Sequence, residues 1–428
     1  MPDRTTPPAI QPASLSFCKP EERVMPNGVP LHIIEAPGVE VVRFDVVFSA
    51  GQWHQARKLQ ALFACRMLRE GCRGYSAAQF AERLDYYGAW LDLSVAMNRT
   101  FVALYTLKKH ARHTLELVHR MLTEPAYSKE QFDIVRANNK AQLMVNLQKG
   151  DVQAMRALRR SVYGDAHPCG MNAQPEDYDT LQVEHVVDFY RSYYGSSNCQ
   201  VYLSGDADEG LLRHVEELFG TEEWGATVDG RRMVDDVDTA ESSRPSDVVH
   251  CQLDNAVQDS IRMGMLLMDV NDEDYLPMRV LTTVLGGYFG SRLMKNVREE
   301  KGYTYHIGAD LVTNTRKVMF LVHCEAQAGR AEEVIAEVHH EMLRLQNERV
   351  SDEELTMVRN YMTGEICRNY ESALSLVDAY IYINNLGLSQ TYIEQMLEVI
   401  RDIDAGHLQQ LAVRYLRPEL LHTVVVHS

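Results

Sequence analysis

The residues best suited to chemistry are Arg298 and Tyr305, which lie on either side of Gly302. They belong to the stretch Gly286–Gly308, which reads GGYFGSRLMKNVREEKGYTYHIG. A guanidinium and a phenol hydroxyl are both hydrogen-bond donors. If Arg298 ends a helix and Tyr305 begins a strand, both side chains could reach one spot beside the Gly302 turn. The simpler interpretation is a helix-turn-strand corner with a surface arginine and a half-buried tyrosine.

The local pattern predicts the elements that would position this pair. Gly286, Gly287 and Gly290 let the backbone bend or approach a ligand closely, so they could bind an extended peptide or form a plain turn. Ser291 can cap a helix, because apolar side chains follow it at helical spacing. Gly302 then ends that helix, and the alternating residues after it predict a strand.

Composition limits the classes of partner. The chain has 428 residues and 43 basic against 60 acidic side chains, which gives a formal net charge of −17. Nucleic acid and anionic membrane need a basic surface, so we expect neither as a partner. We also find no apolar stretch that could span a membrane and no secretory signal. The eight cysteines include no CxxC pair, which favours a reducing compartment, so we expect a cytoplasmic protein.

The order of the predicted elements indicates a duplicated chain. Helices and strands are mixed throughout, which is typical of α/β or α+β layers. The pattern around Ser128 returns around Ser351, an offset of 223 residues. The predicted domains comprise a flexible arm (1–19), an N-terminal domain (20–222), an acidic linker (223–247) and a C-terminal domain (248–428).

These features resemble the pitrilysin/insulinase family of zinc peptidases, the inverzincins, and their inactive relatives. FGSRLMKNVREEKGYTY is similar to one recurrent segment of that family, and YGDAHPCG with FYRSYYGSSNCQVYLSGD is similar to another. The resemblance implies two LuxS/mitochondrial-processing-peptidase-like α/β domains. Each would hold a mixed, mostly antiparallel sheet packed with helices, and together they would form half of a clamshell.

Active members of the family carry H-x-x-E-H on a helix and a further glutamate some 75–80 residues later. Histidines at i and i+4 share a helix face and can ligate one zinc, and the glutamate beside them activates the bound water. Here the ligand positions hold Leu62 and Arg66, and the base position holds Cys65. The third ligand is expected near Gln142, but the stretch Gln131–Gly150 contains a single carboxylate, Asp133. No two of the sixteen histidines are four residues apart. We therefore expect no metal in this chain.

The resemblance assigns the remaining pair a role. In the family an arginine and a tyrosine at this separation bind the substrate backbone, and the tyrosine donates a hydrogen bond to the tetrahedral oxyanion. We therefore expect a non-catalytic subunit of a heterodimeric zinc peptidase. Its homologous partner would hold the zinc, and Arg298 and Tyr305 would bind the peptide substrate in trans. Two alternatives remain: a structural or assembly subunit without a role in proteolysis, and an enzyme with a relocated metal site.

Overall fold

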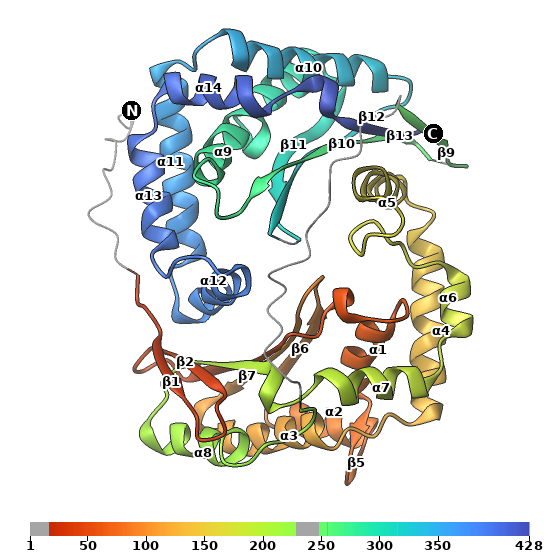
Figure 1. The fold of residues 1–428 in the computed structure, drawn as a ribbon, viewed down its shortest axis with the longest axis vertical. Coiled ribbons are helices and arrows are strands. Elements are labelled where there is room, and N and C mark those ends of the chain that lie inside the picture. The colour runs from red at the N-terminus through yellow and green to blue at the C-terminus, as the bar shows by residue number, and fades with distance from the viewer. Residues whose placement is uncertain (1–16, 228–247, 255, 315, 428) are drawn as a thin grey trace, which may run out of the picture.

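The computed structural model describes residues 17–227, 248–254, 256–314 and 316–427. Most of the predicted arm (1–19) and of the predicted linker (223–247) therefore lies outside the described residues. The rest of the chain forms two large β-sheets packed with helices, which confirms the predicted fold class. Figure 1 shows the two sheets in opposite halves of the molecule.

The first sheet has six strands in the order β1-β2-β8-β3-β7-β6. Neighbouring strands are antiparallel, except that β2 and β8 are parallel. Its central strand β3 is buried almost throughout, as its apolar sequence predicts. The strands are β1 (Glu21–Val24), β2 (Pro30–Glu35), β3 (Val41–Phe48), β6 (Trp90–Val95), β7 (Thr100–Leu107) and β8 (Cys199–Gly205), beside a small ribbon of β4 (Gly71–Cys72) and β5 (Tyr75–Ser76).

The second sheet repeats the arrangement of the first. Its order is β11-β12-β10-β13-β9, and here too one pair, β9 with β13, is parallel. β11 lies at one edge, the place that β6 takes in the first sheet. The strands are β9 (Val249–Gln252), β10 (Gln258–Asp269), β11 (Thr304–Val312), β12 (Lys317–Gln327) and β13 (His422–His427).

The helices follow the same duplication. Ser128 and Ser351 cap two helices of 18 residues, and each serine side chain accepts a hydrogen bond from the backbone amide three residues later. The first half contains α1 (Gln60–Arg66), α2 (Ala77–Tyr86), α3 (Ala111–Thr123), α4 (Lys129–Asn146), α5 (Gly150–Tyr163), α6 (Pro175–Thr180), α7 (Val183–Tyr193) and α8 (Glu209–Phe219). The second contains α9 (Tyr275–Thr282), α10 (Ala331–Asn347), α11 (Asp352–Asn369), α12 (Ala373–Leu386), α13 (Tyr392–Asp402) and α14 (Ala405–Tyr415).

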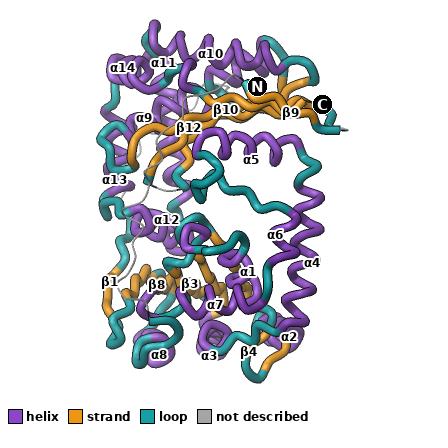
Figure 2. The backbone as a smooth tube through the Cα atoms, turned by 45° about the vertical axis from the view of Figure 1, so that its right-hand side comes forward, coloured by secondary structure: helices purple, strands orange, loops and turns teal. Residues whose placement is uncertain are grey.

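The two halves exchange one helix each. Helix α5 belongs to the first half by sequence but packs on β10 and β13 of the second sheet (Figure 2). Its residues Ala154 and Leu158 share a buried cluster with Leu321 and Val424. Helix α12, which occupies the equivalent place in the second half, packs on β2 and β8 of the first sheet. Each half therefore completes the core of the other.

A buried arginine strengthens the second of these contacts. Arg43 of β3 donates two hydrogen bonds of 2.9 Å to Asp45 and bonds of 2.6 and 3.0 Å to Asp378 of α12. Burial by itself would lower the pKa of Arg43, but the hydrogen bonds to the two carboxylates raise it above its ordinary value. Because the guanidinium is planar, it can serve two carboxylates at once, and it ties α12 to the first sheet.

Two further observations concern the whole described chain. All eight cysteines lie within the described residues, and none of them forms a disulfide. Among the helices of the described residues, none has the length and apolar character needed to cross a bilayer.

Candidate functional site

Helix α1 carries Leu62, Cys65 and Arg66, the three positions at which degenerate metal ligands were predicted, and of these only Cys65 is buried. The helix begins at Gln60, directly after Leu59, which takes a left-handed conformation (φ 74°). Cys65, at the position of the catalytic base, is fully buried, and burial raises the pKa of its thiol to about 12. Its sulfur lies 3.8 Å from the carbonyl oxygen of Ser94. A thiol in this setting stays protonated and does no acid–base work near neutral pH.

The other positions of the lost metal site also lack ligands. Leu62 is half-buried and apolar, and Arg66 is exposed at the last turn of α1. On α4, Gln142 donates to Asn146, and Asp133 is held by Lys129 at 2.7 Å and Arg136 at 3.0 Å. In the described parts of the chain, no three His, Cys, Asp or Glu side chains form a group that could hold a metal ion.

In the second half, two π-helical segments flank a short turn. Helix α9 continues into the segment Thr283–Gly287, the turn follows, and the second segment is Met294–Glu300. Such widened turns are uncommon and occur often at functional sites. Gly286 lies so close to β11 that a Cβ atom there would be 2.6 Å from Ala309. Close helix–strand packing is therefore sufficient to explain Gly286, whereas Gly287 is exposed.

Three polar contacts hold the segment Met294–Glu300 against α10 and α11. Arg292, just before it, forms a bidentate pair with Glu354 at 2.9 and 3.0 Å. Asn296 donates to Glu341 at 2.7 Å, and Lys301 pairs with Glu337 at 2.8 Å. The expected side-chain cap at Ser291 is absent, because these contacts already fix the start of the helix and the buried hydroxyl faces no backbone amide.

After this helix, Gly302 ends the helix as predicted, but Tyr305 is more exposed than predicted. Gly302 has φ +66° and follows the last helical residues, as a C′ glycine does. A β-bulge then interrupts β11 between Thr304 and Ile307, so that two residues stand opposite one of β12. Because the bulge breaks the strict alternation, Tyr305 and His306 are both exposed. Bulges commonly redirect a side chain beside an active site.

The bulge is fixed by a threonine. The hydroxyl of Thr304 donates to the carbonyl of Glu325 at 2.6 Å and accepts from the amide of His306 at 3.1 Å. Tyr305 is 83% exposed as a result, rather than half-buried as the simpler interpretation predicted. An exposed phenol on a fixed backbone is available to donate a hydrogen bond to a bound molecule.

Arg298 lies in the second π-helical segment and stacks on an aromatic ring. Its guanidinium carbon is 4.5 Å from the centre of the Phe289 ring, and Phe289 is itself 61% exposed. Within the described residues, no ion pair neutralises Arg298 and no hydrogen bond joins it to Tyr305. The prediction overlooked Phe289, although an aromatic residue inside the sequence GGYFG is a signal that could have drawn attention to it.

This arrangement places accessible groups of three kinds in the second half of the chain. The unneutralised Arg298, the exposed Phe289 and the exposed Tyr305 offer a cation, an apolar surface and a hydrogen-bond donor. A donor of this kind can stabilise an oxyanion when it is aimed at the developing charge. The second half therefore presents groups that could assist a reaction whose nucleophile comes from elsewhere.

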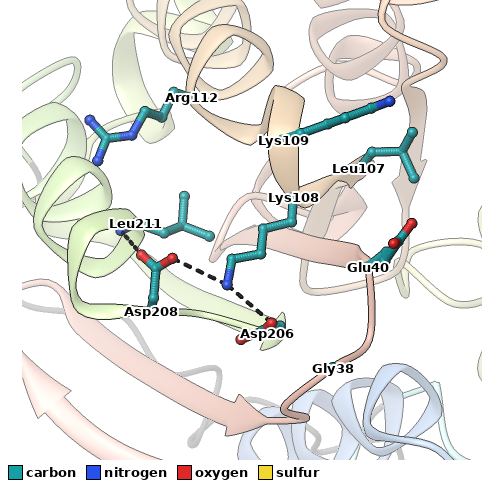
Figure 3. Close-up of a pocket in the computed structure, with 9 residues that line it drawn as sticks. All are labelled: Gly38, Glu40, Leu107, Lys108, Lys109, Arg112, Asp206, Asp208 and Leu211. Carbon is teal, nitrogen blue, oxygen red and sulfur yellow. Dashed lines mark hydrogen bonds and ion pairs between the residues drawn. The ribbon is translucent and has the colours of Figure 1, made fainter.

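A different hollow lies far along the sequence from these residues, beside α3 and α8. It has a volume of about 720 Å³ and is lined by Lys108, Lys109, Arg112, Asp206 and Asp208 among others. Figure 3 shows the ammonium of Lys108 between the two aspartates, 3.0 Å from Asp206 and 3.1 Å from Asp208. Its central charge is thus already compensated, and the hollow offers no ready site for an anion.

Comparison with known proteins relates the chain to one peptidase family. The family model of the peptidase M16 inactive domain matches residues 180–362. The uncharacterized zinc protease YmxG of Bacillus subtilis is 20% identical over 353 residues, which span 82% of this chain and 84% of that protein. The mitochondrial-processing peptidase subunit alpha-1 of Dictyostelium discoideum is 21% identical over 209 residues, 47% of this chain and 31% of that protein.

A solved structure extends the likeness to nearly the whole chain. The peptidase M16 inactive domain from Pseudomonas fluorescens has a TM-score of 0.82 at 18% identity. The match covers 95% of this chain and 98% of that one. The duplicated fold described above is therefore shared, and the resemblance drawn from the sequence motifs is confirmed.

Proposed function

We propose that the chain is a member of the M16 peptidase family, the family of the pitrilysin/insulinase resemblance, and that it is the non-catalytic subunit of a two-chain zinc peptidase. A homologous partner chain holds the zinc and activates the water. The two chains close like a clamshell over a peptide. This chain binds the peptide backbone through Arg298 and aims the Tyr305 hydroxyl at the oxyanion.

The observation that carries the proposal is a difference in side-chain exposure between α1 and the segment from Gly286 to Tyr305. On α1, Cys65 is fully buried. By contrast, Tyr305 is 83% exposed and Arg298 has no ion-pair partner among the described residues. A chain selected only for folding gains nothing from an exposed tyrosine, an exposed Phe289 and an uncompensated arginine in one segment. The same groups are useful if a second chain supplies the metal.

One relative supports a partnership between this chain and a second peptidase chain. One of them is named as the alpha-1 subunit of the mitochondrial processing peptidase, so a chain with related sequence is a subunit of a peptidase. We propose a cytoplasmic location, because none of the cysteines forms a disulfide. Gly286, Gly287 and Gly290 are proposed as the backbone that borders the peptide, with Gly287 the most accessible of the three.

Co-expression with a homologous chain that carries H-x-x-E-H tests the proposal. Each chain is purified alone and as the pair, zinc is measured by elemental analysis, and cleavage of an unstructured peptide is followed by mass spectrometry. We expect zinc in the partner and full activity only in the pair. Robust cleavage by this chain alone with added zinc would refute the proposal.

The same pair separates the assembly alternative from the proposed role. If the chain only stabilises its partner, Arg298→Ala leaves the activity of the pair within about twofold of wild type. If Arg298 binds substrate, activity falls about 100-fold. Lys295→Ala, at an exposed position on the same helix, serves as the matched control because it removes a cation without touching Phe289.

A further inference from the structure

A cavity of about 410 Å³ lies beside the glycine-rich turn and contains an arginine that no part of the proposed function uses. Its walls come from α9, β11, α11 and α12. Arg279 lines it together with Tyr275, Tyr370 and Tyr382, and Gly287 borders it. The cavity is therefore rich in hydrogen-bond donors and adjoins the segment that carries Arg298.

Within the described part of the chain, no carboxylate neutralises the charge of Arg279. Its Nη1 donates to the hydroxyl of Tyr392 at 2.6 Å, which leaves most of its five N–H donors for other partners. Across the described residues, no carboxylate comes within ion-pairing distance of Arg279. The two acids that line the cavity have other partners: Asp310 lies 3.3 Å from His323, and Glu365 lies 3.8 Å from Arg368.

The tyrosines around Arg279 form a neutral, donor-rich wall. The hydroxyls of Tyr275 and Tyr382 are 2.9 Å apart, and Thr313 lies 3.3 Å from Tyr382. Burial raises the pKa of Tyr275 and of Tyr392 above the ordinary value, so both hydroxyls remain protonated at physiological pH. Neutral phenols cannot balance the guanidinium, and a half-buried cation without a counter-charge favours an anionic ligand.

We propose that this cavity binds a carboxylate of the peptide substrate, with Arg279 as its counter-charge and the tyrosine hydroxyls as additional donors. The proposal rests on the proposed function, because it names the class of peptide that the chain would hold. A guanidinium pairs well with a carboxylate, since two parallel N–H groups meet its two oxygens. The carboxylate comes either from the C-terminus of the peptide or from an acidic side chain.

The position of the cavity along β11 predicts how far the carboxylate lies from the residue that contacts Tyr305. Ala309, Asp310 and Leu311 of β11 line the cavity, and Tyr305 lies earlier on the same strand. At about 3.3 Å per residue, Asp310 is roughly 16 Å from Tyr305 along the strand. An extended peptide that contacts Tyr305 would therefore reach Arg279 with a carboxylate roughly five residues away.

Calorimetric titration of the full chain with three N-acetylated hexapeptides tests this site. One has only uncharged side chains and a free C-terminal carboxylate, one is its uncharged amide, and one is the amide with a single internal glutamate. We expect the free acid to bind about 10-fold more tightly than the amide. The glutamate peptide shows which source of the carboxylate is preferred. Equal affinity of all three, or no binding of any at millimolar concentration, would overturn the proposal.

Variants separate a binding role of Arg279 from a structural one. Arg279→Gln should remove the preference for the acid while leaving the affinity for the amide unchanged. Glu365→Gln removes a like charge from the cavity wall and should strengthen binding of the acid about threefold. Because Glu365 is partly exposed, this variant keeps the test valid if Arg279→Gln fails to fold. Unchanged or weaker binding of the acid by Glu365→Gln would contradict the proposal.

The experiments distinguish failure of the carboxylate site from failure of the proposed function. If Arg298→Ala disables the peptidase pair but acid and amide peptides bind equally, the carboxylate site is wrong and the role of Arg298 stands. If the preference for the acid holds but Arg298→Ala has no effect on the pair, the chain binds peptides without assisting catalysis.

Discussion

Helix α1 in the first half and the segment from Gly286 to Tyr305 in the second differ in one decisive respect. On α1 the position of the catalytic base is filled by Cys65, which is fully buried. In the second segment Phe289 and Tyr305 point out of the core, and Arg298 has an aromatic neighbour instead of a counter-charge. Cys65 on α1 is packed in the core, whereas the second segment keeps polar groups accessible to solvent.

The difference teaches that loss of one chemical function need not disturb the fold. The two sheets retain the same strand order, and helices α5 and α12 are still exchanged between the halves. An apolar side chain or a protonated thiol is tolerated on α1 because the helix packs into the core. Exposed aromatic groups contribute little to stability, and under the proposed function those of the second segment contact the peptide.

The largest expected effect comes from putting the catalytic carboxylate back on α1. Cys65→Glu places an ionisable group in a fully buried position, where the effect of burial outweighs the favourable charges of Arg69 and Arg66. We expect a loss of about 3–5 kcal/mol in the free energy of unfolding, because a buried carboxyl must either lose its solvation or remain protonated. Urea denaturation measures the change.

Arg66→His, the exposed neighbour on the same helix, is the matched control and should change stability by less than about 0.5 kcal/mol. A Cys65→Glu variant as stable as wild type would show that the buried position of Cys65 tolerates a carboxyl group, and the contrast between the two regions would fail.

The exchange of helices predicts a smaller loss in the free energy of unfolding, and this loss should be similar for the two exchanged helices. Leu158 of α5 and Ile381 of α12 occupy equivalent places, and both are buried in clusters that cross between the halves. Truncation of either to alanine should cost about 3 kcal/mol, since each leaves a cavity in a packed core. Ile134→Ala, at a position 48% exposed, should cost far less. A strong asymmetry between the two variants would mean that one half folds without the other's helix.

Phe289 offers the smallest predicted effect. Phe289→Ala removes the ring under Arg298 and should weaken peptide binding by the pair about threefold, because an exposed cation–π contact contributes about 0.5–1 kcal/mol. Phe289→Tyr keeps the ring and should behave like wild type. The Michaelis constant of the reconstituted pair is the measurement, and an effect of Phe289→Tyr as large as that of Phe289→Ala would contradict this role.

Much of this architecture follows from the sequence. The strand after Gly302, the C′ role of Gly302 and the two matching helices at Ser128 and Ser351 were predicted from local pattern. The degenerate metal positions Leu62, Cys65 and Arg66 stay a prediction, which rests on the spacing that helix geometry fixes. Family and fold were within reach for the same reason.

Features that depend on tertiary contact were not predictable. The bulge that exposes Tyr305 is fixed by the bond from Thr304 to Glu325, which lies 21 residues further along the chain. The exchange of α5 and α12 depends on packing between the halves, and local periodicity carries no information about which sheet a helix covers. The cavity around Arg279 joins four elements, so its missing counter-charge becomes visible only in three dimensions.

The most direct test of the central claim is the turnover number of the reconstituted pair with Tyr305→Phe in this chain. The account predicts a fall of about 100-fold in kcat with little change in the Michaelis constant, because the hydroxyl acts on the oxyanion and not on the bound substrate. Tyr86→Phe, at another exposed tyrosine, should leave both constants unchanged. A kcat for Tyr305→Phe within about twofold of wild type would contradict the claim.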